Sequence, residues 1–353
     1  MTVEITGRQQ WQSWQSNLLP MVEQVQDGLW SIPVPIPDNP LRYTLVYAHE
    51  TANGLVLVDA GWDSEETWKA LVAGIAVTGY RSADVEGVLV THYHADHYGL
   101  AERIRGVSGA WVAMHVRDAE VLANLPTDRG TWERRVAEQL TTHGCPEGQA
   151  RAAAGEMQLG RFVGRGVPDR LLQNGQTLEV GGVELRVVWT PGHSPGHSCF
   201  HAPDRRVLFS GDHVLPRITP QVAAMDSDAA EDPLTDYLGS LERVRLADIE
   251  EVLPAHEYRF RGLASRLQFL ASHHTERLIE LGAAVSAHPG STAWELCSVL
   301  TWSRLWETFS PLSQRFALGE TLAHLIMLRA RGEVIGLPSR PVRWYTAAGG
   351  CTW

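Results

Sequence analysis

The chain has 353 residues, a formal charge of -11 at pH 7, and 44% hydrophobic and 20% charged residues. This composition is typical of a folded globular protein, and the length predicts one large domain plus a smaller one. The negative charge argues against nucleic acid as a partner, and no apolar run is long enough to span a bilayer.

The N-terminal segment and the cysteines give two further expectations, on location and on disulfides. No basic segment precedes an apolar stretch near Met1, so we predict a cytoplasmic location without a secretory signal. The four cysteines are far apart, which is not typical of a disulfide framework or of a thiolate metal site.

The first third of the chain predicts alternating strands and helices. Strands are expected over residues 29–36, 43–48 and 55–59, the last two joined by the hairpin dipeptide Asn53-Gly54. A helix is expected to begin after Ser64 and end near Gly79. A buried strand over 85–90, a strand over 111–115 and a helix over 117–125 follow.

The segment 126–166 has a different pattern, with two expected helices over 128–143 and 146–159. We interpret it as a helical insertion over the active-site face, although a structural helical pair fits the sequence equally well. Its apolar residues Trp132, Met157 and Phe162 are candidates for a substrate-pocket wall, and packing within the helices is the favoured alternative for each.

Strands resume over 176–180 and 183–189, joined by Gly181-Gly182, and continue over 207–210 and 249–253. A helix is expected to begin at Asp232-Pro233. From residue 257 the pattern is helical, with a helix over 320–331, and a hairpin over 334–337 and 342–345 closes it. We therefore predict an α/β domain over 1–256 and a second domain over 257–353.

The informative motif is the run Thr91-His92-Tyr93-His94-Ala95-Asp96-His97. Alternate residues after a strand point the same way, so His92 and His94 can reach one metal ion while Asp96 and His97 turn toward a second. Imidazole nitrogen and carboxylate oxygen suit zinc and leave a coordination position for water. A surface histidine cluster is the weaker interpretation.

Three further polar residues each follow a predicted strand: His193 in Thr190-Pro191-Gly192-His193, Asp212 in Ser210-Gly211-Asp212-His213, and His256 in Pro254-Ala255-His256. Strand ends on one edge of a sheet converge, so these side chains should share one cleft with the histidine run.

With these motifs the chain resembles the metallo-β-lactamase-fold hydrolases up to residue 257. The resemblance implies an αββα sandwich with a binuclear site along one sheet edge. It implies that His92, His94 and His193 hold the first ion, that Asp96, His97 and His256 hold the second, and that Asp212 bridges both. Asp96 would also orient the nucleophile.

Other polar residues are expected outside the ligand set. Asp59 matches a family aspartate that accepts a hydrogen bond from a ligand imidazole, with a turn-capping role as the alternative. His197 competes with His193, and we assign it to a supporting position. His213 is assigned a structural role, and the remaining histidines, including His273 and His274, are assigned to the solvated surface.

The resemblance implies a hydrolase with two zinc ions per chain, or iron or manganese in their place. A metal-bridging hydroxide would attack a small ester, thioester or lactone-like substrate. A β-lactamase is disfavoured by the bridging aspartate, glyoxalase II by the absence of its basic tail, and an acyl-homoserine lactonase by Val214-Leu215-Pro216 where a tyrosine is expected. The run from Gly211 to Pro220 resembles a branch with an appended winged-helix-like domain, which includes thioesterase-like hydrolases and an endoribonuclease.

Three alternatives stay open: an endoribonuclease, a sulfur dioxygenase with one iron held by His92, His193 and Asp212, and a non-catalytic metal sensor. The C-terminal region has only a slight excess of arginine over glutamate, so we favour a packing or homodimer-forming role for it over nucleic-acid recognition.

Overall fold

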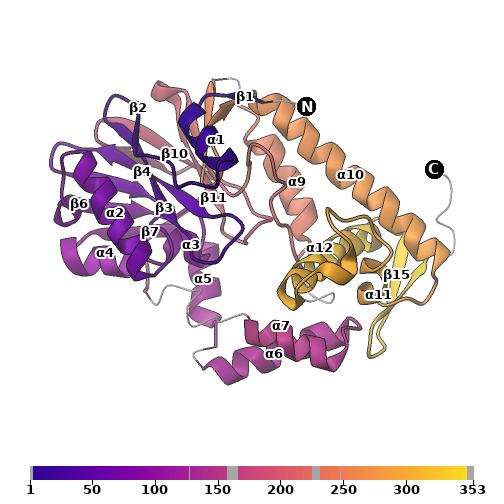
Figure 1. The fold of residues 1–353 in the computed structure, drawn as a ribbon. Helices are drawn as coiled ribbons and strands as arrows, with labels where there is room; N and C mark the ends of the chain where they lie inside the picture. The colour runs from indigo at the N-terminus through magenta and orange to yellow at the C-terminus, as the bar shows by residue number, and fades with distance from the viewer. Residues whose placement is uncertain (1–2, 127, 157–165, 225–230, 247, 348–353) are drawn as a thin grey trace. The chain divides into compact units, whose positions relative to one another are not determined.

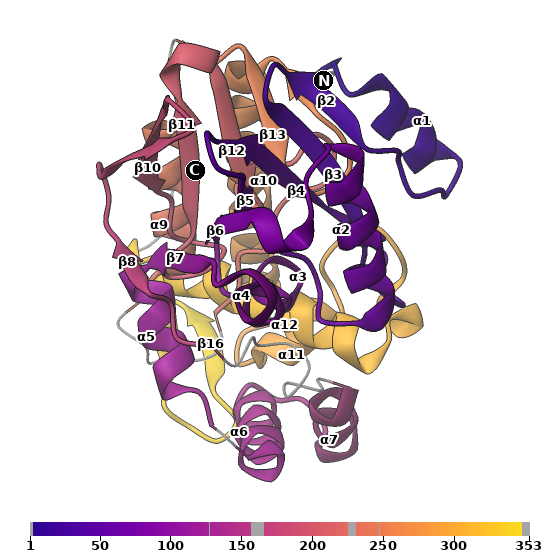
Figure 2. The same ribbon diagram turned by 90° about the vertical axis from the view of Figure 1, so that its left-hand side faces the viewer.

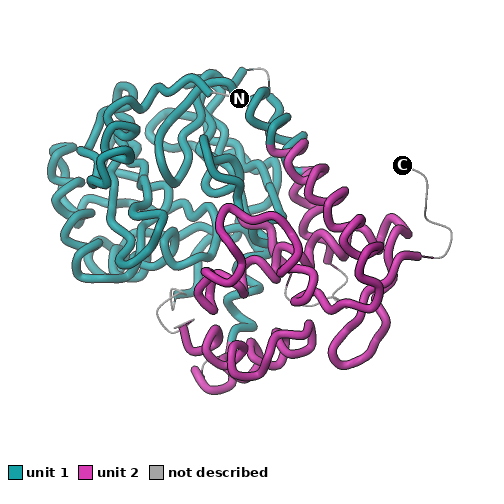
Figure 3. Tube along the Cα trace, turned by 45° about the vertical axis from the view of Figure 1, so that its right-hand side comes forward, with its two compact units in different colours: residues 1–125, 161–220, 240–269 teal, residues 126–160, 221–239, 270–353 magenta. Residues whose placement is uncertain are grey.

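The computed structural model describes residues 3–126, 128–156, 166–224, 231–246 and 248–347. The chain divides into two compact units, shown in different colours in Figure 3. The first comprises residues 1–125, 161–220 and 240–269, and the second comprises residues 126–160, 221–239 and 270–353.

The first unit contains two seven-stranded sheets (Figure 1). One sheet has the order β2 (Glu23–Gln26), β3 (Leu29–Pro35), β4 (Tyr43–Glu50), β5 (Leu55–Val58), β6 (Val85–Leu89), β7 (Trp111–His115) and β8 (Arg170–Leu172). The other has the order β1 (Glu4–Ile5), β14 (Phe260–Arg261), β13 (Glu251–Pro254), β12 (Val207–Gly211), β11 (Ser198–Ala202), β10 (Val183–Trp189) and β9 (Thr177–Val180).

Strand β4 shows why the sheets pack face to face. Tyr43, Leu45 and Tyr47 belong to a buried cluster that also contains Phe200 and Phe209 of the other sheet. The alternate residues Val46 and Ala48 belong to a second buried cluster. Because successive side chains of a strand point to opposite faces, β4 lies between two apolar layers. The predicted sandwich is confirmed.

The second apolar layer lies between the first sheet and its helices. These helices include α2 (Glu65–Val77) and α4 (Ala101–Ser108), shown in Figure 2. Leu71 and Ile75 of α2 and Ile104 of α4 belong to this layer. Ser64 caps α2 as predicted, since its side chain accepts a hydrogen bond from the Thr67 N–H at 3.1 Å. The other helices of this region are α1 (Arg8–Gln15), α3 (Ala95–Tyr98) and α5 (Val116–Asn124).

The expected hairpins are present. The loop containing Asn53 and Gly54 joins the antiparallel strands β4 and β5. Gly181 and Gly182 join β9 to β10 with φ values of 58° and 77°, which a two-residue hairpin requires of its turn. Strand β11 was missed because Ser198 and His201 interrupt its apolar residues, which leaves neither a continuous apolar run nor a regular alternation.

The second unit is mainly helical. It contains α6 (Arg129–Thr142), α7 (Glu147–Glu156), α11 (Ala293–Cys297), α12 (Pro311–Ala330) and the hairpin of β15 (Val334–Leu337) and β16 (Arg343–Thr346). Helix α7 packs on α6 and α12, and the Leu312 N–H donates to a carboxylate oxygen of Glu156 at 3.2 Å. The predicted helix pair and final hairpin are confirmed as elements, and the domain boundary near residue 257 stays a prediction.

Two long helices have residues in both units, α9 (Pro233–Arg243) and α10 (Leu263–Ala287). On α10 the prediction of solvated histidines is wrong for His274, which is 1% exposed. His274 lies on the buried stripe of this helix, between Leu270 and Leu278 at helical spacing. The prediction is also wrong for other histidines that are buried: His49, His115, His143, His201 and His324.

Candidate metal centre

Strand direction brings the candidate residues to one edge of the sandwich. His92 follows β6 of the first sheet, and His193, Asp212 and His256 follow β10, β12 and β13 of the second. Strands β10 and β12 are both antiparallel to β11, and β13 is parallel to β12, so all three end at the same edge. Asp96 and His97 lie in the short helix α3 rather than in a loop.

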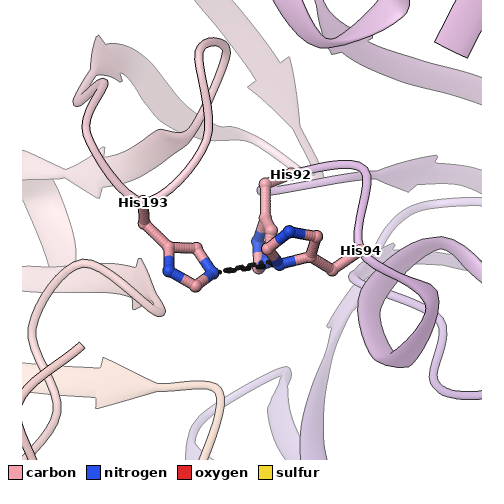
Figure 4. Close-up of side chains that lie close together, drawn as sticks. All are labelled: His92, His94 and His193. Atoms are coloured by element: carbon pink, nitrogen blue, oxygen red, sulfur yellow. Dashed lines mark hydrogen bonds between the residues drawn. The ribbon is translucent and has the colours of Figure 1, made fainter. Parts of the chain in front are cut away.

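Three histidines form the first group. The Nε2 atom of His92 lies 2.9 Å from Nδ1 of His94 and 3.2 Å from Nε2 of His193. The His193 and His94 nitrogens are 3.0 Å apart. Figure 4 shows the three rings pointing toward one another from two different loops. Three nitrogen atoms that converge in this way could hold one metal ion.

Asp96, His97 and His256 form the second group. The Asp96 Oδ2 atom lies 3.4 Å from His256 Nε2 and 3.7 Å from His97 Nε2. Nitrogen and oxygen atoms again converge on one point.

The Asp212 carboxylate lies between the two groups. Its Oδ1 atom is 3.1 Å from His256 Nε2 and 3.6 Å from His97 Nε2. Its Oδ2 atom is 3.6 Å from His193 Nε2. One carboxylate therefore faces the first group with one oxygen and the second group with the other.

The donor atoms fit a cation. Asp212 Oδ1 and the Nε2 atoms of His97 and His256 are buried, and none forms a hydrogen bond with the described residues. Buried polar atoms without a partner require an explanation, and a bound ion supplies one. The nitrogen and oxygen donors match the preferences of zinc, iron or manganese.

The pKa shifts agree with this fit. Burial and the Asp212 carboxylate act in opposite directions on His256, and its pKa is raised. Burial would also lower the pKa of His97, but the carboxylates of Asp96 and Asp59 outweigh it and the pKa is raised well above its usual range. Burial raises the pKa of Asp212, yet His256 and His97 hold it well below its usual range. The carboxylates of the second group therefore favour positive charge at this point, whether a proton or a metal ion carries it.

In the first group the pKa of His92 shifts in the opposite direction. Burial and the neighbouring rings of His97, His94 and His193 lower the pKa of His92 well below its usual range. This ring stays neutral, which is the form that binds a metal ion.

Asp59 supports the second group. Its Oδ2 atom accepts a hydrogen bond from His97 Nδ1 at 2.8 Å, and its Oδ1 atom accepts one from the Thr91 N–H at 2.8 Å. His97 Nδ1 therefore carries a proton, and Nε2 faces the second group. His256 is oriented similarly, because its Nδ1 donates to the Tyr43 carbonyl oxygen at 2.9 Å.

His197 does not join the first group. Its Nε2 accepts a hydrogen bond from the Asp212 N–H at 3.1 Å, and its Nδ1 lies 2.7 Å from Thr190 Oγ1. Both ring nitrogens are used by the protein. His213 is buried and belongs to neither of the two groups that could hold an ion.

Two buried carboxylates near the centre were missed by sequence reasoning. Asp118 lies in the first turn of α5, after β7, and Glu257 directly follows His256. Burial raises the pKa of the Asp118 carboxyl to about 7, although its three hydrogen bonds lower it. The strand-end argument that found His193 would have found Asp118 if it had been applied to β7. The same argument applied to β13 would have found Glu257, which directly follows His256.

Of the pocket-wall candidates, Trp132 lies on α6 in the second unit. Met157 and Phe162 lie outside the described residues. The pocket-wall prediction therefore stays a prediction.

The similarity of this chain to known proteins agrees with this geometry. The model of the metallo-beta-lactamase superfamily matches residues 40–256. The chain belongs to this superfamily. The match contains every residue of the two groups and Asp212, and members of the superfamily bind metal ions.

Two relatives differ in what their names say. The Lactamase-like protein adaB of Aspergillus niger is 28% identical over 274 residues, which are 76% of this chain and 67% of that protein. The human acyl-coenzyme A thioesterase MBLAC2 is 32% identical over 194 residues, which are 54% of this chain and 61% of that protein. The chain thus matches about two thirds of each relative's length.

Solved structures match over more of the chain. A metallo-beta-lactamase family protein of Thermus thermophilus is 31% identical with a TM-score of 0.75, and the match covers 92% of this chain and 100% of that one. A beta-lactamase domain protein of Burkholderia ambifaria is 29% identical with a TM-score of 0.78, and the match covers 92% and 94%. Within the described ranges, no helix is long and apolar enough to cross a membrane.

Proposed function

We propose that this chain is a binuclear zinc hydrolase of small esters or thioesters, with acyl thioesters as the first substrate class to test. In this proposal His92, His94 and His193 hold one ion. Asp96, His97 and His256 hold the other, and Asp212 bridges the two.

The observation that carries the proposal is the position of Asp212, whose two carboxylate oxygens face different groups. Two bound ions would lower the pKa of water toward about 7 and polarise the substrate carbonyl. The chain itself would orient the reacting water through the Asp96 carboxylate. Asp59 and Tyr43 would hold the rings of His97 and His256 in the tautomer that leaves Nε2 available.

The thioester class is favoured by the likeness to the human acyl-coenzyme A thioesterase. Lactones and simple esters react at the same type of carbonyl and remain in the proposed class. No specific observation favours the endoribonuclease or the sulfur dioxygenase.

The test begins with metal analysis of the protein purified without added metal. We expect about two zinc ions per chain, whereas one iron per chain would contradict the proposal and favour oxygenase chemistry. The same protein is then tested on acyl thioesters, lactones, simple esters and single-stranded RNA.

Asp212→Asn should lose the second ion and nearly all thioesterase activity. The matched control is Asp204→Asn, which changes an exposed aspartate of the same unit and should behave as the unchanged protein. Cleavage of RNA alone would show that the proposed substrate class is wrong.

A further inference from the structure

The Asp118 carboxylate joins the two loops that carry the three-histidine group. Its Oδ2 atom accepts hydrogen bonds from the Tyr93 N–H at 3.0 Å and from Ser194 Oγ at 2.8 Å. Its Oδ1 atom accepts one from the Gly196 N–H at 2.5 Å. Tyr93 lies between His92 and His94, and Ser194 directly follows His193. Each loop therefore donates at least one hydrogen bond to the same side chain.

The arrangement is built closely around this carboxylate. Asp118 is 0% exposed, and a Cβ atom at Gly196 would lie 2.7 Å from the Asp118 Cγ atom. Only a residue without a side chain lets the second loop approach this closely. A buried carboxylate is unfavourable unless it is fully hydrogen-bonded, so the three donors and the carboxylate hold one another in place.

The two loops come from different sheets. The first follows β6 and the second follows β10. The spacing of His193 from His92 and His94 therefore depends on contacts between the loops. The Ser198 N–H, which donates to the Thr91 carbonyl oxygen at 2.8 Å, is one such contact. Asp118 provides another such contact, and its hydrogen bonds reach Tyr93 and Ser194, the immediate neighbours of the histidines.

We propose that Asp118 is a positioning residue that sets the geometry of the three-histidine group and thereby the affinity of its ion. The hydrogen bonds of the Asp118 carboxylate go to the loops and not to the three imidazole rings. It therefore acts through the backbone of Tyr93 and the side chain of Ser194. The inference rests on the proposed function, because it requires that the three histidines bind an ion.

Glu257 provides a matched comparison. It is 0% exposed, its Oε2 atom accepts from the Arg217 N–H at 3.1 Å, and its Oε1 atom accepts from Arg217 Nε at 2.9 Å. Glu257 directly follows His256, so these hydrogen bonds join this position to the loop after Asp212, on the side of the second group. A general loss of stability would affect both ions in either variant, whereas a positioning role predicts that each variant affects its own ion.

The experiment isolates one ion at a time. The variant His256→Asn removes a ligand of the second group and retains the three histidines, and His193→Asn does the reverse. Asp118→Asn and Glu257→Gln are introduced separately into each background. Metal is removed with a chelator, and Zn²⁺ affinity is measured by competition with a chromophoric chelator, with circular dichroism and thermal unfolding as checks of folding.

We expect Asp118→Asn to lower the Zn²⁺ affinity about 10- to 100-fold in the His256→Asn background, as is typical of residues that orient metal ligands. It should leave the affinity nearly unchanged in the His193→Asn background. Glu257→Gln should show the reverse pattern. Equal loss in both backgrounds, or no loss in the first, would overturn the inference.

If Asp118→Asn does not fold, Ser194→Ala replaces it, because this change removes one hydrogen bond and keeps the carboxylate. A several-fold loss of affinity in the His256→Asn background is then expected, and an unchanged affinity would overturn the inference. Failure of the proposed function gives a different result, because it appears in the unchanged protein as one iron per chain or as cleavage of RNA alone, whereas failure of the inference appears only when the variants are compared.

Discussion

The imidazole of His197 holds the backbone of Asp212, with the Asp212 N–H donating to His197 Nε2 at 3.1 Å. The other nitrogen of this ring lies 2.7 Å from Thr190 Oγ1, so the ring is fixed at both ends. His197 thus positions the carboxylate that faces both groups.

Replacing His197 with alanine should therefore lower metal affinity and activity about 10- to 100-fold, because Asp212 loses its orienting partner. His197→Gln can accept the Asp212 N–H through its amide oxygen and should retain more of both. Zinc content and thioester hydrolysis are the measurements. Equal loss in the two variants would contradict the assigned role.

Asp59→Asn should weaken the second ion. The carboxylate accepts from His97 Nδ1 and from Thr91, and an amide loses the charge that makes the imidazole a stronger ligand. We expect about a 10- to 100-fold lower affinity for one of two ions, measured by zinc titration. Asp84→Asn is the control, since Asp84 pairs with the exposed Arg81 in the same unit, and it should leave both affinities unchanged.

Gly211→Ala should disrupt the centre through contact and backbone strain. Gly211 has a φ of 49°, and a Cβ atom there would lie 2.7 Å from His197 Nε2 and 2.9 Å from Thr91 Cβ. We expect loss of bound zinc and of activity. Gly109→Ala is the matched control, because Gly109 has a φ of 75° and nothing within 4 Å of such an atom. It should lower stability by about 1 kcal/mol and leave zinc content unchanged.

The second unit should lose stability on acidification. His274 Nδ1 lies 3.2 Å from His324 Nε2, and His324 Nδ1 donates to the Glu320 carbonyl oxygen at 2.7 Å. Burial and the neighbouring His324 lower the pKa of His274 from its usual 6.5 to about 3. Burial also lowers the pKa of His324 to about 4.

The sign follows from which state binds protons. Below pH 6.5 the unfolded chain takes up protons that the folded chain does not, so the free energy of unfolding falls by about 1.4 kcal/mol per pH unit for each histidine. His274→Gln cannot titrate and should flatten this dependence in urea unfolding between pH 7.5 and 4.5. His288→Gln, at an exposed position, should not flatten it, and an unchanged slope in His274→Gln would contradict the prediction.

The convergence of the seven candidate ligands could be predicted because each follows the end of a strand, directly or in the short helix α3, and strand ends converge. The strands of the sandwich could be predicted because most are short, apolar and bounded by turn residues such as Asn53-Gly54, whereas the sandwich itself was implied by the resemblance to the metallo-β-lactamase fold. Strand β11 could not be predicted, because Ser198 and His201 leave neither a continuous apolar run nor a regular alternation.

The supporting residues were harder to predict. Asp118 and Glu257 follow strand ends, which indicates their place near the centre, but local spacing carries no signal for their hydrogen bonds to backbone groups of distant loops. His274 was predicted wrongly for a different reason. Its apolar stripe on α10 is present in the sequence, but the charged neighbours indicated a solvated position.

Each candidate group takes ligands from both sheets. The first draws His92 and His94 from the end of β6 and His193 from the end of β10. The second draws Asp96 and His97 from the first sheet and His256 from the end of β13. Any ion held by either group is therefore a cross-link that closes one edge of the sandwich. Its removal should increase amide hydrogen exchange at the C-terminal ends of β6 and β13 more than at the N-terminal ends of the same strands, which lie at the opposite edge.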